Sequence, residues 1–277
     1  MARVSGLWIG SPLSPLERAC IASFLTRGHQ FDLFTYEEIP GVPDGCRVLD
    51  AAEVLPRERV FAHSAGVGRG SVAAFSDCFR YELLYRHGGW WVDLDVFCLT
   101  DSLPDAGFVV GRQGPTIINS AILRAPAGHP VVAAARSACE TKSSEVEWGE
   151  LGPDLLTRLM RQHGLDATAF PPEVFYPVDW QHYWAVLDPR RAADVLNRMR
   201  SAACIHLWNE MLRRIQFDKN VLPPQGSVLR SLYEASIGVS EFTHEYALAV
   251  DCAPNALQLE IRSRCPEPGV PGTFTHQ

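Results

Sequence analysis

Asp93 and Asp95 are separated by one residue and close a short apolar run, Trp90-Trp91-Val92. Side chains alternate along a strand, so residues two apart point to the same side and both carboxylates can reach one hard divalent cation. Two acids this close repel each other unless a cation lies between them. The pair therefore predicts a metal site at the end of a strand; a polar loop without a ligand is the alternative.

A helix is expected directly before this strand. Ser71 is a candidate N-cap, and the helix should end at His87, where Gly88-Gly89 supplies the positive backbone angles that a helix stop needs. Its apolar anchors are Phe75, Phe79, Leu83 and Tyr85. The glycine turn brings the chain back, so the two acids should lie near the preceding helix.

Asp77 and Arg80 lie three residues apart on one face of this helix. An exposed Asp-Arg pair at this spacing is usually a weak surface ion pair. Its place beside Asp93 and Asp95 favours a contact with a substrate instead.

The residues from Ser76 to Val96 read S-D-x-x-R-Y-x-x-L-Y-x-x-G-G-x-W-x-D-x-D-V. This run resembles the signature of the retaining, metal-dependent glycosyltransferases that carry a DXD sugar-binding region. That group includes Golgi mannosyl- and N-acetylglucosaminyltransferases, bacterial capsular transferases and, more distantly, the clostridial glucosylating toxins. The resemblance implies a GT-A-like α/β fold: a single domain with a mixed, mostly parallel sheet flanked by helices.

The resemblance extends over residues 4–232 and implies the domain organisation. A catalytic domain is expected at residues 1–240, with a nucleotide-sugar half before residue 100 and an acceptor-facing half from residue 101. The extension at residues 241–277 is expected to be partly irregular, because Pro266, Pro268 and Pro271 stand among glycines.

The first expected strand, residues 4–9, resembles the strand that binds the donor in this family. Trp8 is expected against the uracil ring, since bases stack on aromatic faces, and Ile9-Gly10 lets the backbone approach the nucleotide. A core position is the alternative for Trp8. The resemblance also implies donor contacts and catalytic roles for the central segment, namely Asp77, Arg80, Trp91, Asp93 and Asp95.

Two polar residues farther along are open to two interpretations each. Asn119 falls inside an apolar strand, where the resemblance implies a contact with sugar hydroxyls; a backbone partner would also satisfy its amide. Asp154 follows a Gly-Pro turn like that of the family and is a candidate sugar contact. It could equally be an acid in the first turn of a helix, where the dipole favours it.

The segment Cys204 to Asn209 resembles the part of the family that completes the metal and diphosphate site. It implies that His206 ligates the metal and that Asn209 supplies an oxygen to the metal or a hydrogen bond to the diphosphate; a histidine satisfied within the core is the alternative for His206. Imidazole beside carboxylates suits Mn²⁺ better than Ca²⁺. Three cations could then close over the phosphates or simply face solvent: Arg213, Arg214 and Lys219.

The remaining pattern predicts an α/β chain. Strands are expected at residues 31–36, 108–111, 116–123 and 175–177, and helices at 12–27, 129–139 and 189–201. Residues 37–70 should be loops with a short helix near 51–55. An aromatic loop from Trp180 to Trp184 could line an acceptor groove or close the core.

Composition restricts the partners. The 277 residues carry a net charge of −7, which argues against nucleic acid as a partner, while peripheral membrane association stays open. The eight cysteines include no CxxC pair, so buried free thiols in a reducing cytosol are expected. Neither a signal peptide nor an apolar run of ~20 residues is found. We therefore expect a cytoplasmic, bacterial protein; the oligomeric state is not predicted.

The expected reaction is transfer of a hexose or N-acetylhexosamine from a nucleotide sugar to a hydroxyl of a glycan or glycoconjugate, as in polysaccharide biosynthesis. By the resemblance, the donor is a UDP-sugar and the cofactor Mn²⁺ or Mg²⁺. A toxin-like protein-modifying transferase and a catalytically silent sugar-nucleotide-binding module are alternatives. A haloacid-dehalogenase-type phosphatase also fits Asp93 and Asp95, but Lys142 and Lys219 are not followed by the pair of acids it needs.

Overall fold

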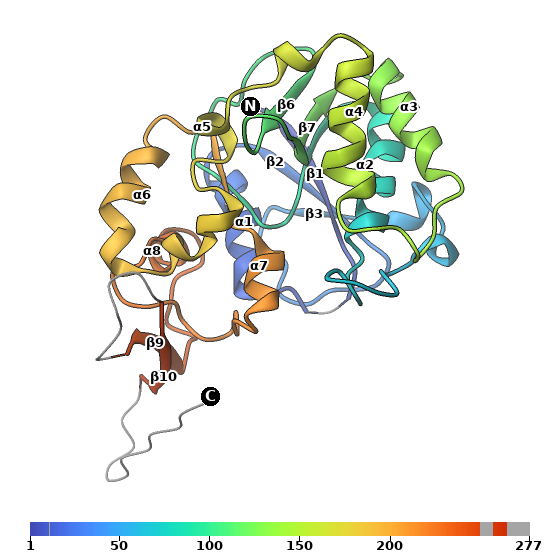
Figure 1. The fold of residues 1–277 in the computed structure, drawn as a ribbon. Coiled ribbons are helices and arrows are strands. Elements are labelled where there is room, and N and C mark those ends of the chain that lie inside the picture. The colour runs from blue at the N-terminus through green and yellow to red at the C-terminus, as the bar shows by residue number, and fades with distance from the viewer. Residues whose placement is uncertain (11, 250–256, 265–277) are drawn as a thin grey trace.

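The computed structural model describes residues 1–10, 12–249 and 257–264. A central sheet carries helices on both faces (Figure 1). The expectations for Cys252, Cys265 and the prolines Pro266, Pro268 and Pro271 lie outside the described residues.

The central sheet has six strands in the order β3-β2-β1-β4-β7-β6. The first four are parallel to one another, and β7 and β6 are antiparallel to their neighbours. This mixed, mostly parallel sheet flanked by helices confirms the predicted GT-A-like α/β class. The strands are β1 (Arg3–Trp8), β2 (Gln30–Thr35), β3 (Arg47–Asp50), β4 (Gly89–Val92), β6 (Val109–Arg112) and β7 (Ile118–Ala125).

Two small antiparallel pairs accompany the central sheet. They are β5 (Val96–Cys98) with β8 (Cys204–His206), and β9 (His244–Leu248) with β10 (Leu259–Ser263). The second pair lies in the extension, where the sequence analysis predicted no strand. Its β9 joins the rest of the chain at Leu222, which exchanges backbone hydrogen bonds with His244 and Tyr246.

Eight α-helices occur in the described ranges. They are α1 (Pro15–Thr26), α2 (Ala73–His87), α3 (Pro130–Cys139), α4 (Leu155–Gln162), α5 (Pro172–Phe175), α6 (Ala192–Met199), α7 (Asn209–Arg214) and α8 (Val228–Ser236). Figure 1 shows α2, α3 and α4 side by side on one face of the sheet, where they enclose one apolar cluster. Residues of α1 belong to the clusters that cover the other face. No helix of the described segments is long and apolar enough to span a lipid bilayer.

Alternation along the central strands explains why both faces are covered. In β1, Leu7 packs into the cluster under α2, whereas Val4 packs into the opposite cluster. In β4, Trp91 points to the α2 side, whereas Trp90 and Val92 point away from it. A strand that is apolar on both sides reads as a continuous apolar run, which is how the sequence revealed β4.

Most predicted elements form; the differences include the start of α2, the strand expected at 175–177 and the missed strand β3. Helix α2 begins at Ala73, and Val72, not Ser71, occupies the N-cap position. The Ser71 hydroxyl still accepts the Ala73 N–H, at 3.2 Å. The strand expected at 175–177 is wrong, because two prolines start α5, the second within its first turn. Strand β3 was missed, since it is a short edge strand with no buried side chain and therefore has no apolar pattern.

Candidate active site

The site forms where β4 leaves the central sheet. The Asp93 N–H still donates to the Ala121 carbonyl of β7 at 2.8 Å, and the chain then turns, with the Val96 N–H donating back to the Asp93 carbonyl at 3.1 Å. The turn leads straight into β5, which pairs with β8 so that Val96 lies opposite His206. This pairing brings a histidine from 111 residues away against the aspartate pair.

Asp93, Asp95 and His206 form a cluster that could hold a metal ion. Each offers one ligand atom, and these atoms lie within 4.8 Å of one another. His206 Nε2 lies 3.1 Å from Asp95 Oδ1, and the Asn209 N–H donates to Asp95 Oδ2 at 2.8 Å. The predicted gathering of the three ligand residues is therefore observed, whereas the recorded contact of Asn209 is made by its backbone.

Two features of the His206 segment indicate that it is arranged to bind a ligand. Within the described residues, His206 Nδ1 is buried without a hydrogen-bond partner, which is costly unless something else satisfies it. Trp208, two residues on, has a φ of 53°, a left-handed conformation that is uncommon outside glycine. This backbone turns the chain so that the first N–H of α7 reaches Asp95.

The two aspartates of the pair have opposite electrostatic surroundings. Burial raises the pKa of Asp93 despite the opposing Arg80 guanidinium, and the charge of Asp95 adds to the rise. Burial acts on Asp95 in the same direction, but the His206 imidazole and the Asn209 N–H outweigh it and lower the Asp95 pKa. Asp95 is therefore the better-stabilised anion of the two.

The Arg80 side chain links α2 to the aspartate pair. Its side chain is 3% exposed and forms ion pairs with Asp77 at 3.2 Å and Asp93 at 3.0 Å. It also donates to the Ser120 carbonyl at 2.5 Å, and its guanidinium lies 5.1 Å from the centre of the Trp91 ring. The Asp77–Arg80 ion pair considered from the sequence is therefore present but buried and not on the surface, and Arg80 fixes the orientation of the Asp77 and Asp93 carboxylates.

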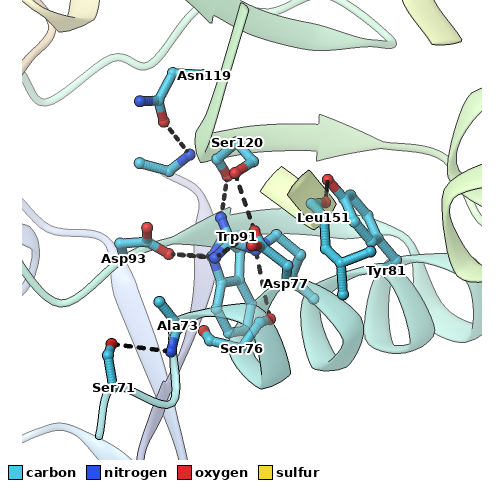
Figure 2. A network of polar contacts seen from close by, with 12 residues as sticks. Ser71, Ala73, Ser76, Asp77, Tyr81, Trp91, Asp93, Asn119, Ser120 and Leu151 are labelled. Carbon is cyan, nitrogen blue, oxygen red and sulfur yellow. Dashed lines mark hydrogen bonds and ion pairs between the residues drawn. The ribbon is translucent and has the colours of Figure 1, made fainter. Parts of the chain in front are cut away.

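Figure 2 shows how the neighbouring side chains complete this network. Trp91 Nε1 donates to Asp93 Oδ1 at 2.8 Å, and Ser120 Oγ donates to Asp77 Oδ1 at 3.1 Å. Trp91 is only 1% exposed, so it holds the Asp93 carboxylate from the protein interior. Burial raises the pKa of Asp77 from its ordinary 3.8 to about 6, although Arg80 opposes this rise.

The Gly-Pro turn found in the sequence packs directly on this network. Tyr81 of α2 donates to the Leu151 carbonyl at 3.0 Å, which holds the turn against the helix. A Cβ atom on Gly152 would lie 2.9 Å from Asp77 Oδ2, so only glycine fits here. The sequence analysis missed Gly152, although the Gly-Pro pair was its signal. Asp154, the candidate it chose, is exposed at the start of α4.

Asn119 and Trp8 lie on either side of the aspartate pair. Asn119 Oδ1 accepts the Ala121 N–H at 2.6 Å and its Nδ2 donates to Gln113 at 2.5 Å, which favours the alternative of an amide satisfied by its own surroundings. Trp8 ends β1 half-buried, with Lys219 Nζ 5.9 Å from its ring centre. Gly10 has a φ of 100°, and its N–H donates to Glu37 at 2.9 Å.

The three cations expected near the phosphates have acidic partners. Lys219 pairs with the buried Glu17 of α1. Arg213 and Arg214 both pair with Glu210, at 2.7 and 2.9 Å. Contact of these cations with phosphates stays a prediction, because each would have to leave its carboxylate partner or bind the carboxylate and the phosphate together.

Two family models match parts of this chain. A family model described as the alpha 1,4-glycosyltransferase conserved region matches residues 124–233, and one described as a capsular polysaccharide synthesis protein matches residues 63–113. The second match contains the aspartate pair with Asp77 and Arg80, and the first contains His206.

Similar curated proteins carry related names. Lactosylceramide 4-alpha-galactosyltransferase of Rattus norvegicus is 31% identical over 149 residues, which cover 49% of this chain and 40% of that protein. Alpha-1,4-N-acetylglucosaminyltransferase of Homo sapiens is 23% identical over 61% of this chain and 52% of that protein. The chain therefore spans less than half of the rat relative's length and about half of the human one.

A solved structure described as the PaToxG glycosyltransferase covers 60% of this chain and 72% of its own, with 16% identity and a TM-score of 0.43. The family-model matches and the curated relatives confirm the glycosyltransferase resemblance predicted from the DXD segment: residues 124–233 are similar to the conserved region of alpha-1,4-glycosyltransferases.

Proposed function

We propose that this protein is a metal-dependent, retaining glycosyltransferase that moves a hexose or N-acetylhexosamine from a nucleotide sugar, most simply a UDP-sugar, to a hydroxyl of a glycan. One observation carries the proposal: the side chains of Asp93, Asp95 and His206 converge at a strand end directly beside the buried Arg80. The alpha-1,4-glycosyltransferase match supports the same reaction class.

The cluster fits a divalent cation, because two carboxylates and an imidazole are suitable ligands for Mn²⁺ and acceptable ones for Mg²⁺. Within the described residues His206 Nδ1 has no hydrogen-bond partner, which supports a role for this imidazole in binding a ligand. When bound, the cation would neutralise the negative charge that develops on the departing diphosphate.

The protein's own residues would position the donor around this point. Arg80 fixes Asp93 and Asp77 in one orientation, so that no rearrangement is needed when the donor arrives. Asp77, held by Ser120, is the candidate partner for sugar hydroxyls. Trp8, at the end of the neighbouring strand β1, is the candidate platform for the base. The transition state is expected to have oxocarbenium character, as in other glycosyl transfers.

Donor hydrolysis tests this proposal. Wild type and Asp95→Ala are incubated with a panel of UDP- and GDP-sugars, with Mn²⁺ or with a chelator. We expect one donor to be hydrolysed only with metal, by wild type and the control variant but not by Asp95→Ala. Asp105→Ala is the matched control, because that carboxylate is 96% exposed and contacts only Arg124 among the described residues. Hydrolysis that survives in Asp95→Ala would contradict the assigned role of the cluster.

The remaining expectations are proposals of the same kind. The six cysteines of the described residues are free thiols, as expected, which suits the proposed cytoplasmic location. The carbohydrate acceptor is supported by the capsular polysaccharide match. The bacterial origin stays a prediction.

A further inference from the structure

A cavity of about 720 Å³ opens beside the aspartate cluster and has no role in donor binding as described above. Its walls come from the turn between β6 and β7, from α5, from the aromatic segment at 177–181 and from the end of α6. The volume falls within the range of pockets that bind small organic ligands.

The cavity adjoins the cluster through one shared side chain. The Tyr176 ring lines the cavity and makes an edge contact with the His206 ring, with 5.8 Å between the ring centres. On the sheet side, Gln113 lines the cavity and accepts a hydrogen bond from Asn119, two residues before the Ala121 carbonyl that holds Asp93. A ligand in the cavity would therefore lie next to the predicted position of the metal and the reacting sugar.

The strand order places this cavity opposite the base platform. β4, which delivers Asp93, lies between β1 and β7 in the sheet. Trp8 ends β1 on one flank, and the β6–β7 turn forms the cavity wall on the other flank. Two substrates that meet at the aspartate pair can thus approach from opposite sides without overlapping.

The lining residues favour an uncharged, polyhydroxylated ligand. Trp180 is 42% exposed and offers an aromatic face, on which the C–H side of a sugar ring can pack. Around it, Glu173, Gln181 and Asn197 have side-chain polar groups with no hydrogen-bond partner within the described residues. The carboxylates of Glu173 and Asp179 would repel an anionic sugar, and Arg198 is paired with Asp194 at 3.2 Å.

We propose that this cavity binds the end of the acceptor as a neutral saccharide, with one ring stacked on Trp180 and its hydroxyls held by the uncommitted carboxylate and amides. The inference rests on the proposed transferase function and adds the substrate class: neutral glycans, not sialylated or phosphorylated ones. It also assigns Trp180, the first residue of the aromatic loop whose role the sequence left open, to acceptor binding.

Calorimetric titration tests the cavity directly. The probes are neutral oligosaccharides, such as lactose, N-acetyllactosamine and maltotriose, and the sialylated forms of the first two, titrated into full-length protein with UDP and Mn²⁺. We expect at least one neutral probe to bind, its sialylated form to bind at least tenfold more weakly, and Trp180→Ala to weaken the neutral probe at least tenfold. Trp180→Phe should restore most of the affinity because it keeps an aromatic face.

Leu196→Ala is the matched control, because Leu196 is a similarly exposed apolar side chain, 46% exposed, on the helix that ends at the cavity but outside its lining. Glu173→Gln should reduce the difference in affinity between the neutral and the sialylated probes. The proposal is overturned if no neutral probe binds, if Trp180→Ala binds like wild type, or if the sialylated form binds better.

Donor hydrolysis separates this inference from the function on which it rests. Trp180→Ala should hydrolyse the donor at the wild-type rate, since Trp180 is not part of the aspartate cluster. Loss of donor hydrolysis in Trp180→Ala with retained saccharide binding would overturn the assignment of the cavity. Failure of wild type to hydrolyse any donor would count against the transferase function, while the titration would still decide what the cavity binds.

Discussion

Replacing Gly152 by alanine tests whether the Gly-Pro turn sets the geometry of the site. The added Cβ would lie 2.9 Å from Asp77 Oδ2 and 3.0 Å from both Asp77 Oδ1 and Ser120 Oγ. Ordinary contact begins at 3.4 Å, so the carboxylate must retreat by 0.5 Å at one oxygen and 0.4 Å at the other. Asp77 cannot move alone, because it is tied to Arg80 at 3.2 Å and to Ser120 at 3.1 Å.

The expected cost has two parts. Inserting a methyl group into a packed, buried position destabilises a protein by about 1–3 kcal/mol, and each kcal/mol lowers the melting temperature of a chain this size by about 2–4 °C. The displacement of Asp77 is also transmitted through Arg80 to Asp93, which lies 3.0 Å from the guanidinium. Displacing a catalytic group by half an ångström should lower donor turnover by about tenfold.

Gly107→Ala is the control for Gly152→Ala. A Cβ on Gly107 would meet no atom within 4 Å, and its φ is not positive, so it should leave both readouts unchanged. Thermal unfolding and donor hydrolysis are measured on both variants. If Gly152→Ala melts and turns over donor like Gly107→Ala, the turn does not hold Asp77, and the reasoning fails.

Three further predictions concern the charges of the site. With chelator present, the free energy of unfolding should fall by about 3 kcal/mol as pH rises from about 4 to 6, because the Asp77 pKa lies above its unfolded value, and Asp77→Asn should flatten this slope in pH-dependent urea unfolding. Arg80→Ala should destabilise the protein by about 3–5 kcal/mol, since it leaves buried carboxylates unpaired, whereas Arg3→Ala, which removes a 56% exposed side chain, should cost under about 1 kcal/mol in the same assay. Mn²⁺ should raise the melting temperature of wild type, by the equivalent of about 2.7 kcal/mol at a hundredfold excess over its Kd, and an equal rise in Asp95→Ala would contradict the cluster as its site.

The local part of the site could be predicted from sequence because its spacing is set by secondary structure. A helix followed by a glycine stop and a short apolar strand fixes where Asp77 and Asp93 lie relative to each other, whatever the rest of the chain does. The same holds for β1 and the helix after it, although the predicted start at residue 12 was three residues early: α1 begins at Pro15, where the Ser14 N–H donates to Glu17 at 3.0 Å.

The sequence did not predict the features that depend on long-range packing. The close approach of Gly152 to Asp77 follows from how the turn docks on α2, and no periodicity encodes it. Asn119 was undecided because its amide partner, Gln113, lies in the connection between β6 and β7, and the pairing of these strands has a register shift between Val110 and Gly111. His206 was found only through the family resemblance, since a histidine in a three-residue strand has no signal of its own.

The charges that meet at the site explain why its prediction needed both the local sequence and the family resemblance. The carboxylates of Asp77, Asp93 and Asp95, the first buried and the other two partly buried, gather around the single guanidinium of Arg80. Among the described residues that contact these groups, His206 is the one that can add further positive charge. Even with a protonated imidazole, one negative charge remains when all three acids are ionised. Burying such a charge is expensive unless it is paired, so this group of residues is explained by a cationic ligand better than by the stability of the fold. The local sequence supplies the excess of acid, and the distant histidine then determines where a cation can be held.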